Sequence, residues 1–156
     1  MSKPPITSIL VLCEGNHCRA PMAEGLLREA LGPAVRVSSA GLDALVGAPP
    51  DPEAMRLMKA HGVDIASHRG RQVTPEMALE SDLILVMDAR QRAWCVDLVP
   101  SACGRIFLLG HWLGSPPPDI SDPYGQGPDA FRLAFDAIRQ SVTAWVPHLR
   151  SEQRPA

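Results

Sequence analysis

A cysteine and an arginine separated by five residues could together bind and attack an oxyanion. They bound the segment Cys13-Glu14-Gly15-Asn16-His17-Cys18-Arg19, which lies between a short apolar run and a helix-like stretch. Backbone N–H groups in a tight loop at a helix N-terminus converge on one point, where the helix dipole favours negative charge. Gly15 permits torsions that other residues resist, and Asn16 tolerates a left-handed conformation. The segment therefore predicts a phosphate-binding loop.

The two terminal residues of this loop supply the chemistry. Arg19 offers a planar, permanently charged fork that can bind two phosphate oxygens at once. A thiol in such a loop should ionise more easily than a free cysteine, whose pKa is about 8.5. Cys13 beneath a bound phosphate would then be placed for in-line attack and a cysteinyl-phosphate intermediate. The alternative is a buried structural cysteine with a solvated arginine, because Cys-x5-Arg alone is common; the strand, the Gly-Asn pair and the helix favour the anion site.

Strand-like and helix-like runs alternate along the chain and must position this loop. They predict a three-layer α/β sandwich whose four-stranded, mainly parallel sheet is flanked by helices, with the phosphate-binding loop after strand 1. Ligands of such sheets bind outside the carboxyl ends of the strands. We expect one domain over residues 1–150 and a frayed tail at 151–156. The expected strands are 6–12, 35–39, 82–87 and 105–109, and the expected helices are 20–31, 52–61, 74–80, 89–98 and 129–149.

Composition excludes several classes of function. The net charge is -2 and only 4% of residues are aromatic, which argues against nucleic-acid binding. No apolar run approaches the roughly 20 residues that span a bilayer, so we expect a cytoplasmic protein without membrane insertion. The four cysteines form no Cys-x-x-Cys pair, and neither a metal site nor a cofactor is predicted. Cys95 and Cys103 are interpreted as small buried apolar residues.

The stretch 11–21 resembles the phosphate loop of the low-molecular-weight protein tyrosine phosphatases. The likeness continues through Ser39-Ala40-Gly41, Ser67-His68, Arg71-Gln72, Met87-Asp88 and Asp122-Pro123-Tyr124. Gly110-His111-Trp112 and residues 41–47 resemble the bacterial capsule and exopolysaccharide branch of the family more than the animal branch. The resemblance implies a phosphoric monoester hydrolase that acts on phosphotyrosine, with a bacterial tyrosine autokinase of exopolysaccharide synthesis or export as substrate. It also implies that inorganic phosphate or other oxyanions bind as product or inhibitor.

The resemblance places the general acid at Asp122. From the residues alone, Asp-Pro would be a turn. A carboxylic acid there could protonate the leaving group and then, as carboxylate, activate water. Asp119 and Asp129 compete for this role and are interpreted as a turn residue and a helix cap. Tyr124 could line the pocket and stack against an aromatic substrate, or it could pack onto the core; both alternatives stay open.

Three further residues have roles that only the resemblance implies. Ser39 and His68 would hydrogen-bond Asn16 and hold the loop, where the alternative is ordinary polar surface. Cys18 would form a protective disulfide with Cys13, where the alternative is a small buried residue.

The chain departs from the family pattern at three positions. Ala20 stands where relatives usually carry Ser or Thr, whose hydroxyl helps to hold the thiolate, so we expect slower turnover or a less acidic thiol, but not inactivity. His17 replaces an apolar residue at the pocket wall and can be partly cationic near neutral pH. Glu14 stands where many relatives have a small or apolar residue. Because the signs of the charges at these last two positions oppose each other, no peptide preference follows.

Two other functions compete with phosphotyrosine hydrolysis. Arsenate reduction on the same fold would need a cysteine relay, for which Cys95 and Cys103 are candidates. A non-catalytic phosphotyrosine-binding module is suggested by Ala20. His61, His111 and His148 have no partner by spacing and are assigned no role.

Overall fold

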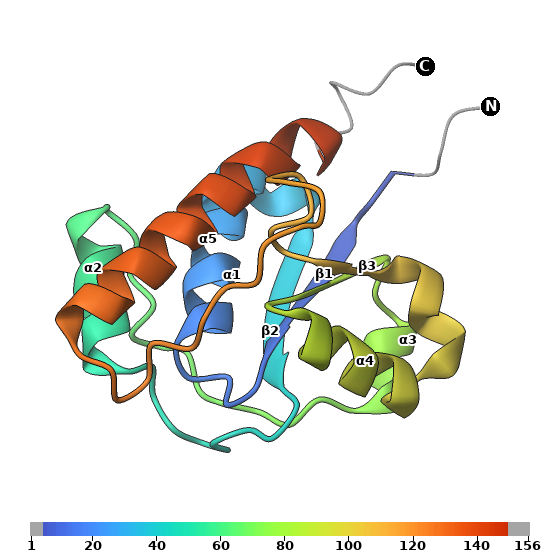
Figure 1. Ribbon diagram of the computed structural model, residues 1–156, viewed down its shortest axis with the longest axis horizontal. Coiled ribbons are helices and arrows are strands. Elements are labelled where there is room, and N and C mark those ends of the chain that lie inside the picture. The colour runs from blue at the N-terminus through green and yellow to red at the C-terminus, as the bar shows by residue number, and fades with distance from the viewer. Residues whose placement is uncertain (1–4, 150–156) are drawn as a thin grey trace.

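Four parallel strands form the centre of the protein (Figure 1). The structure is a computed structural model that describes residues 5–149, so the tail expected at 151–156 lies outside the described residues. The sheet order is β2-β1-β3-β4, and all three neighbouring pairs are parallel. The strands are β1 (Ser8–Cys13), β2 (Arg36–Gly41), β3 (Leu83–Val86) and β4 (Ile106–Leu108). The predicted fold class is confirmed.

Helices cover both faces of this sheet (Figure 1). α1, α2 and α5 pack on one face, and α3 and α4 pack on the other. In the described part of the chain the helices are α1 (Arg19–Leu31), α2 (Pro52–Ala60), α3 (Pro75–Leu79), α4 (Ala89–Leu98) and α5 (Pro128–Leu149). The 3-10 helices η1 (Gly32–Ala34) and η2 (Pro100–Arg105) precede β2 and β4. Within residues 5–149, no helix has both the length and the apolar character needed to cross a bilayer.

The central strand β1 carries the candidate cysteine. All six of its residues are buried. Ile9, Val11 and Cys13 face the core beneath α1 and α5, whereas Leu10 and Leu12 face the core beneath α3 and α4. A strand buried on both faces explains the continuous apolar run in the sequence. Cys13 is therefore fixed at the carboxyl end of the central strand, directly before the loop that leads into α1.

Side-chain caps define where three helices begin. Asp51, Thr74 and Asp88 each accept a hydrogen bond from a backbone N–H in the first turn of the following helix, as N-cap residues do. The expectation that Asp129 caps α5 is wrong, because α5 begins at Pro128 and Asp129 lies inside its first turn, paired with Arg132. Asp119 does more than form a local turn, because its Oδ1 accepts a hydrogen bond from the N–H of Ala89 at 3.2 Å.

The remaining cysteines and histidines differ in their surroundings. Cys95 is fully buried, as predicted, and its burial raises the pKa of its thiol. The prediction that Cys103 is buried is wrong: this residue is exposed because it lies on the outer side of η2. The three unassigned histidines have packing partners that spacing could not show. His61 packs on Phe135, His111 on Trp145, and His148 stacks on Trp112.

Asp82 joins the beginnings of β1 and β3. Its Oδ2 accepts hydrogen bonds from both Thr7 N–H and Oγ1–H and from Ser8 N–H, and these donors hold the pKa of the carboxyl below its ordinary value. A lowered folded-state pKa stabilises the fold above the unfolded-state pKa of about 3.9, and this contribution is lost as the pH falls through the folded-state pKa.

Replacing Asp82 by asparagine should therefore destabilise the protein by about 1 kcal/mol at pH 7, a value reduced for the exposure of the carboxyl. Urea unfolding of both proteins at pH 7 and near pH 3 measures this. The difference in unfolding free energy should shrink at the lower pH; a difference that grows instead would contradict the assignment.

Candidate active site

The loop between β1 and α1 turns its carbonyl groups outward. The carbonyls of Cys13, Glu14, Gly15 and His17 accept hydrogen bonds from backbone N–H groups of the segment 42–51, at 2.8–3.0 Å. The carbonyl of Asn16 accepts one from Nε2 of His68 at 3.0 Å. In a trans peptide the C=O and the following N–H point in opposite directions. The N–H groups of residues 14–18 therefore face the inside of the loop, where they form an anion-binding nest at the N-terminus of α1.

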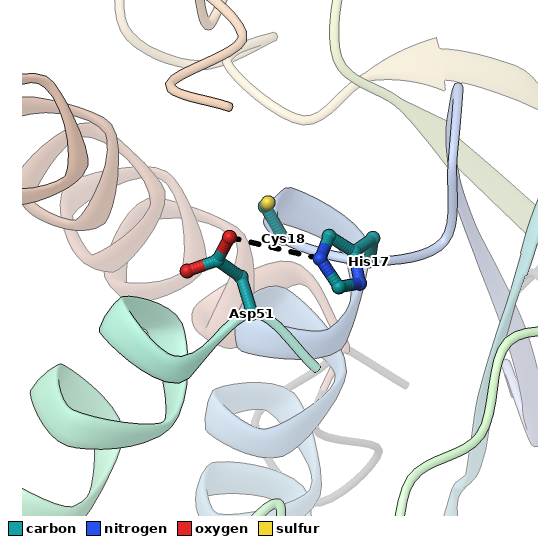
Figure 2. A group of neighbouring side chains, drawn as sticks. All are labelled: His17, Cys18 and Asp51. Atoms are coloured by element: carbon teal, nitrogen blue, oxygen red, sulfur yellow. Dashed lines mark ion pairs between the residues drawn. The ribbon is translucent and has the colours of Figure 1, made fainter. Parts of the chain in front are cut away.

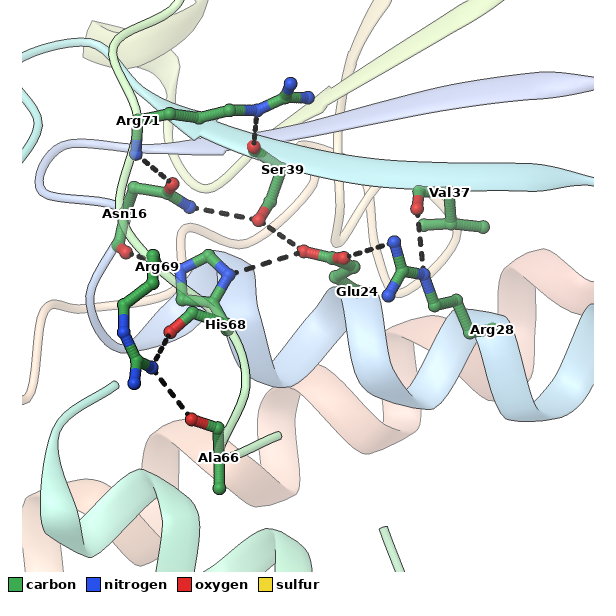
Figure 3. Close-up of polar contacts among 9 residues, drawn as sticks. All are labelled: Asn16, Glu24, Arg28, Val37, Ser39, Ala66, His68, Arg69 and Arg71. Atoms are coloured by element: carbon green, nitrogen blue, oxygen red, sulfur yellow. Dashed lines mark hydrogen bonds and ion pairs between the residues drawn. The ribbon is translucent and has the colours of Figure 1, made fainter. Parts of the chain in front are cut away.

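Asn16 fixes the shape of this loop. Its φ is +54°, the left-handed conformation expected from the sequence. Its side chain is fully buried and satisfied at both ends: Nδ2 donates to Ser39 Oγ at 3.0 Å, and Oδ1 accepts from the N–H of Arg71 at 3.0 Å (Figure 3). The expectation for Gly15 is wrong, because its φ lies outside the left-handed region and a Cβ there would make only ordinary contacts. The unusual torsion belongs to Asn16 alone among the non-glycine residues described.

A second layer of polar groups holds Ser39 and His68 in place. Ser39 Oγ donates a short hydrogen bond to Oε1 of Glu24, which also lies 3.8 Å from Nδ1 of His68 (Figure 3). The other carboxylate oxygen of Glu24 pairs with Arg28 at 2.8 Å. Because a carbonyl only accepts, the bond to Asn16 O requires the proton on Nε2 of His68. Both of the hydrogen bonds that the resemblance implied for Asn16 are present.

Glycines let the flanking loops approach this network closely. A Cβ on Gly70 would lie 2.2 Å from the carbonyl oxygen of Leu45, and one on Gly41 would lie 2.7 Å from that of Glu14. Gln72 ties the same region together, because its side chain donates to Leu42 O and accepts from Ala44 N–H. The segment after β2 is therefore held against the nest by backbone contact and not by side-chain packing alone.

Arg19 is buried, with its side chain aimed at the carboxyl end of the sheet. Its Nη1 donates to the carbonyl of Ile120 at 2.7 Å and lies 3.8 Å from Oδ2 of Asp88. Its Nη2 lies 3.7 Å from Oδ2 of Asp122. An arginine side chain that is only 5% exposed needs such partners, since burying an unpaired charge is costly. The contact also brings Asp122, from a distant loop, to the rim of the nest.

These residues enclose a cavity of about 210 Å³. Glu14 is half exposed on its rim and is paired with Arg90 at 2.6 Å. Tyr124 is 55% exposed, so the alternative that it packs onto the core is wrong and it lines the pocket. Its ring meets that of His17 edge to face, with centroids 5.5 Å apart. The lining residues are Cys13, Glu14, Gly15, His17, Cys18, Arg19, Asp43, Leu45, Asp122 and Tyr124.

A larger cavity, of about 730 Å³, lies at the amino ends of β1 and β2. Ser8, Arg36 and Ser81 are among its lining residues, and it contains neither a cysteine nor a histidine. Ligands of parallel sheets bind at the opposite, carboxyl ends. Its size therefore does not make it the candidate site.

Cys18 and Ala20 lie at the start of α1, where the loop ends. Both are buried, and both cysteines of the loop are free thiols. Burial is the main cause that raises the pKa of Cys18 far above its ordinary value, and the nearby carboxylates of Asp51 and Asp122 add to it. Cys18 is therefore held as a protonated thiol, a less reactive form than a thiolate.

Replacing Asn16 by alanine should destabilise the protein, because alanine resists the left-handed conformation by about 1–2 kcal/mol and leaves the buried Ser39 and Arg71 groups with one partner fewer. Asn16→Gly removes the same hydrogen bonds without the conformational cost. Thermal unfolding should rank the wild type above Asn16→Gly and Asn16→Gly above Asn16→Ala. Equal melting temperatures for the two variants would contradict the strain assigned to this residue.

Comparison with known proteins places this site in a family. Residues 8–154 match the family model described as low molecular weight phosphotyrosine protein phosphatase. The chain belongs to this family. The probable low molecular weight protein-tyrosine-phosphatase EpsP of Ralstonia nicotianae is 45% identical to this phosphatase over 146 residues, which cover 94% of this chain and 98% of EpsP.

Solved structures agree with this assignment. The tyrosine phosphatase AmsI of Erwinia amylovora superposes with a TM-score of 0.89 at 38% identity, covering 96% of this chain and 97% of AmsI. Wzb from Escherichia coli K30 in complex with sulphate superposes with a TM-score of 0.87 at 38% identity, covering 92% of this chain and 99% of Wzb. The YwlE arginine phosphatase from Geobacillus stearothermophilus superposes at 0.87 with 31% identity, covering 94% and 95%. Relatives of this phosphatase thus include a sulphate-bound tyrosine phosphatase and an arginine phosphatase.

Three residues of the site escaped sequence reasoning. Asp88 and Arg71 lie in stretches that carried the resemblance, yet neither was assigned a contact. Asp88 could have been found from its position two residues after the end of the buried strand β3, where its side chain caps α4 and lies near Arg19. The sequence signal for Glu24 is weaker: it forms an i,i+4 pair with Arg28 on a predicted helix. Such pairs usually lie on a solvent-exposed helix face, whereas the Glu24 carboxylate is buried.

Proposed function

We propose that this phosphatase hydrolyses phosphotyrosine through a cysteinyl-phosphate intermediate formed on Cys13. The observation that carries the proposal is the outward orientation of five successive carbonyls, which leaves the N–H groups around Cys13 free for phosphate oxygens. In the first step Cys13 Sγ bonds to phosphorus, and the bond from phosphorus to the tyrosine oxygen breaks. In the second step water attacks phosphorus and loses a proton to Asp122, and the bond from phosphorus to Cys13 Sγ breaks to release the thiolate. Residues 14–19 bind the three non-bridging oxygens throughout, with Arg19 bridging two of them.

Asp122 is the proposed proton donor. Its carboxyl is half exposed at the rim, 3.7 Å from Arg19, and its Oδ1 accepts a hydrogen bond from Tyr124 N–H at 3.1 Å. This position above the nest suits a group that protonates the departing phenoxide and then takes a proton from the attacking water. Asp119 is less suited, because its Oδ1 is bonded to Ala89 N–H.

The walls of the cavity favour an aromatic leaving group. The rings of Tyr124 and His17 lie beside the nest, and Leu45 is another lining residue. An aromatic substrate ring can stack there, whereas a phosphoserine side chain is too short to reach these walls while its phosphate lies in the nest. The arginine phosphatase among the relatives makes phosphoarginine the second candidate substrate.

Turnover of phosphotyrosine, phosphoserine, phosphoarginine and arsenate, measured under identical conditions, tests the proposal. We expect the highest kcat/KM for phosphotyrosine peptides. A higher kcat/KM for phosphoarginine would overturn the proposed substrate while leaving the loop chemistry intact.

The proposed physiological substrate is a tyrosine autokinase of exopolysaccharide synthesis or export, met in the cytoplasm. The family and the similarity to EpsP, AmsI and Wzb support this proposal. Deleting the gene in its native host should raise the phosphotyrosine content of that kinase, as read by immunoblot. An unchanged phosphotyrosine content would point to another substrate.

Ala20 is proposed to limit the rate. It is fully buried at the start of α1, next to Arg19. A hydroxyl at this position would add a donor toward the Cys13 sulfur, so Ala20→Ser should raise kcat several-fold, on the scale of one hydrogen bond to a charged group. Ala20→Gly is the matched control, because it adds no donor. An unchanged or lower kcat in Ala20→Ser would mean that this loop does not need the hydroxyl.

Arsenate reduction by a cysteine relay has less support. Cys95 is buried in the core beneath α3 and α4, and Cys103 lies in η2 before the amino end of β4, away from the phosphate loop. A binding-only module is disfavoured because both Cys13 and Asp122 line the cavity.

A further inference from the structure

Three side chains with metal-binding atoms meet beside the phosphate loop. They are His17 and Cys18, from the loop itself, and Asp51, from the N-cap of α2 (Figure 2). One donor atom from each lies within 4.8 Å of the other two. Figure 2 shows a His17 ring nitrogen facing an Asp51 oxygen, with the Cys18 side chain beside this pair. The backbone holds the two segments together, because the N–H of Asp51 donates to the carbonyl of His17 at 3.0 Å.

The donor set and spacing suit Zn²⁺. Imidazole, thiolate and carboxylate are its usual ligands, with bond lengths of about 2.0–2.3 Å, so tetrahedral neighbours lie roughly 3.3–3.7 Å apart. His17 Nε2 and Asp51 Oδ2 are already 3.6 Å apart. The two donor atoms that lie farthest apart must approach each other by about 1 Å, which rotation of the side chains can supply. Three protein ligands leave a fourth position for water, as in open zinc sites.

The hydrogen bonds around these residues leave the donor atoms available. Asp51 uses Oδ1 to cap α2 by accepting from Glu53 N–H at 2.9 Å, and Oδ2 faces His17. Nδ1 of His17 is buried and has no hydrogen-bond partner among the described residues. A buried ring nitrogen without a partner is destabilising. The histidine is therefore not fixed by hydrogen bonds on that side, and its ring can turn to present either nitrogen.

We propose that His17, Cys18 and Asp51 form a binding site for Zn²⁺ or a similar divalent cation of borderline softness, such as Co²⁺. Coordination replaces the S–H bond of Cys18 by a bond from sulfur to the metal and releases the proton to solvent. His17 and Cys18 also line the phosphate cavity, whereas Asp51 does not. A cation on this wall draws two residues of the loop toward α2 and occupies the entrance beside Tyr124. Its binding inhibits turnover, and this second statement rests on the proposed function.

The competing explanation is that His17 and Asp51 form only a structural ion pair. Asp51→Asn separates the two explanations, because asparagine still caps the helix through its side-chain oxygen but is a poor zinc ligand. Cys13 must be removed from the binding test, since a thiol beneath the phosphate could bind the metal alone. Cys13→Ser is therefore the background protein, and Cys103→Ser on that background controls for the exposed thiol.

The first measurement is binding of Co²⁺ and Zn²⁺, as chloride salts, to the full chain carrying Cys13→Ser. We expect one equivalent of Zn²⁺ by calorimetry and a sulfur-to-cobalt charge-transfer absorption with Co²⁺. Cys13→Ser/Cys18→Ser should abolish the absorption, and Cys13→Ser/Asp51→Asn should weaken Zn²⁺ binding at least tenfold. Cys13→Ser/Cys103→Ser should match the background. The site would be overturned if the folded background protein did not bind the metals. It would also be overturned if neither Cys18→Ser nor Asp51→Asn changed the affinity.

The second measurement is inhibition of the protein with Cys13 intact, using p-nitrophenyl phosphate. Zn²⁺ should inhibit and a chelator should restore activity, whereas Asp51→Asn should keep the basal rate and require at least tenfold more Zn²⁺. Equal sensitivity of wild type and Asp51→Asn would overturn the inhibitory role. The binding measurement does not depend on turnover. Its result can therefore be interpreted even if the proposed phosphatase chemistry is wrong.

Discussion

Replacing Cys13 by serine is expected to lower kcat for p-nitrophenyl phosphate by about 10⁴-fold or more, the scale seen when a catalytic nucleophile is lost. A serine hydroxyl is far less ionised than a thiol near neutral pH. Among the described residues that line the cavity, Cys18 is the one other cysteine or serine. The Cys18 thiol cannot take over from Cys13, because burial raises its pKa and keeps it protonated.

Phosphate binding should survive the same substitution. The outward carbonyls and Arg19 remain, so inorganic phosphate should bind Cys13→Ser with an affinity near that of the wild type by calorimetry. Cys95→Ser is the matched control, because it changes a buried cysteine of the opposite core and should retain activity. Activity within tenfold of wild type in Cys13→Ser would contradict the proposed nucleophile.

Replacing Asp122 by alanine is expected to lower kcat for phosphotyrosine by about 10²–10⁴-fold, the usual contribution of general acid–base catalysis. Tyrosine has a pKa of about 10, so its phenoxide is a poor leaving group without a proton. The loss should be smaller for p-nitrophenyl phosphate, whose leaving group is more acidic. Asp122→Asn should behave like alanine although it keeps an acceptor for Tyr124 N–H.

Asp119→Asn is the matched control for this second prediction. Its oxygen can still accept from Ala89 N–H, so activity should be retained. The dependence of kcat on leaving-group pKa gives the decisive reading: it should be steep in Asp122→Ala and shallow in the wild type. Equal slopes, or a larger loss in Asp119→Asn, would assign the proton to another group.

Local patterns were sufficient to predict the elements of the fold. The continuous apolar run of β3 indicated a strand buried on both faces, and Thr74-Pro75 and Asp51-Pro52 marked the starts of α3 and α2. These signals act within a few residues, where capping, torsional preference and burial pattern decide the structure. The same locality explains the error at Cys103, whose exposure depends on which side of η2 faces the solvent.

Local patterns could not predict the contacts between segments that are distant in the sequence. Asn16 was assigned its left-handed torsion correctly, but the freedom assigned to Gly15 is not used. The buried carboxylate of Glu24, 2.8 Å from Arg28 and bonded to Ser39, could not be told from a surface ion pair. The meeting of His17 with Asp51 depends on how α2 packs beside the loop, which no spacing in the sequence records.

Trapping the intermediate tests the central claim most directly. Asp122→Ala is mixed with p-nitrophenyl phosphate and quenched in acid. The phosphorylated enzyme should accumulate, because the good leaving group still departs while the attacking water has lost its base. Peptide mass spectrometry should find one phosphoryl group on the peptide that contains Cys13, and none in Cys13→Ala/Asp122→Ala. A phosphoryl group on another residue, or steady turnover with no modified peptide, would contradict attack by Cys13.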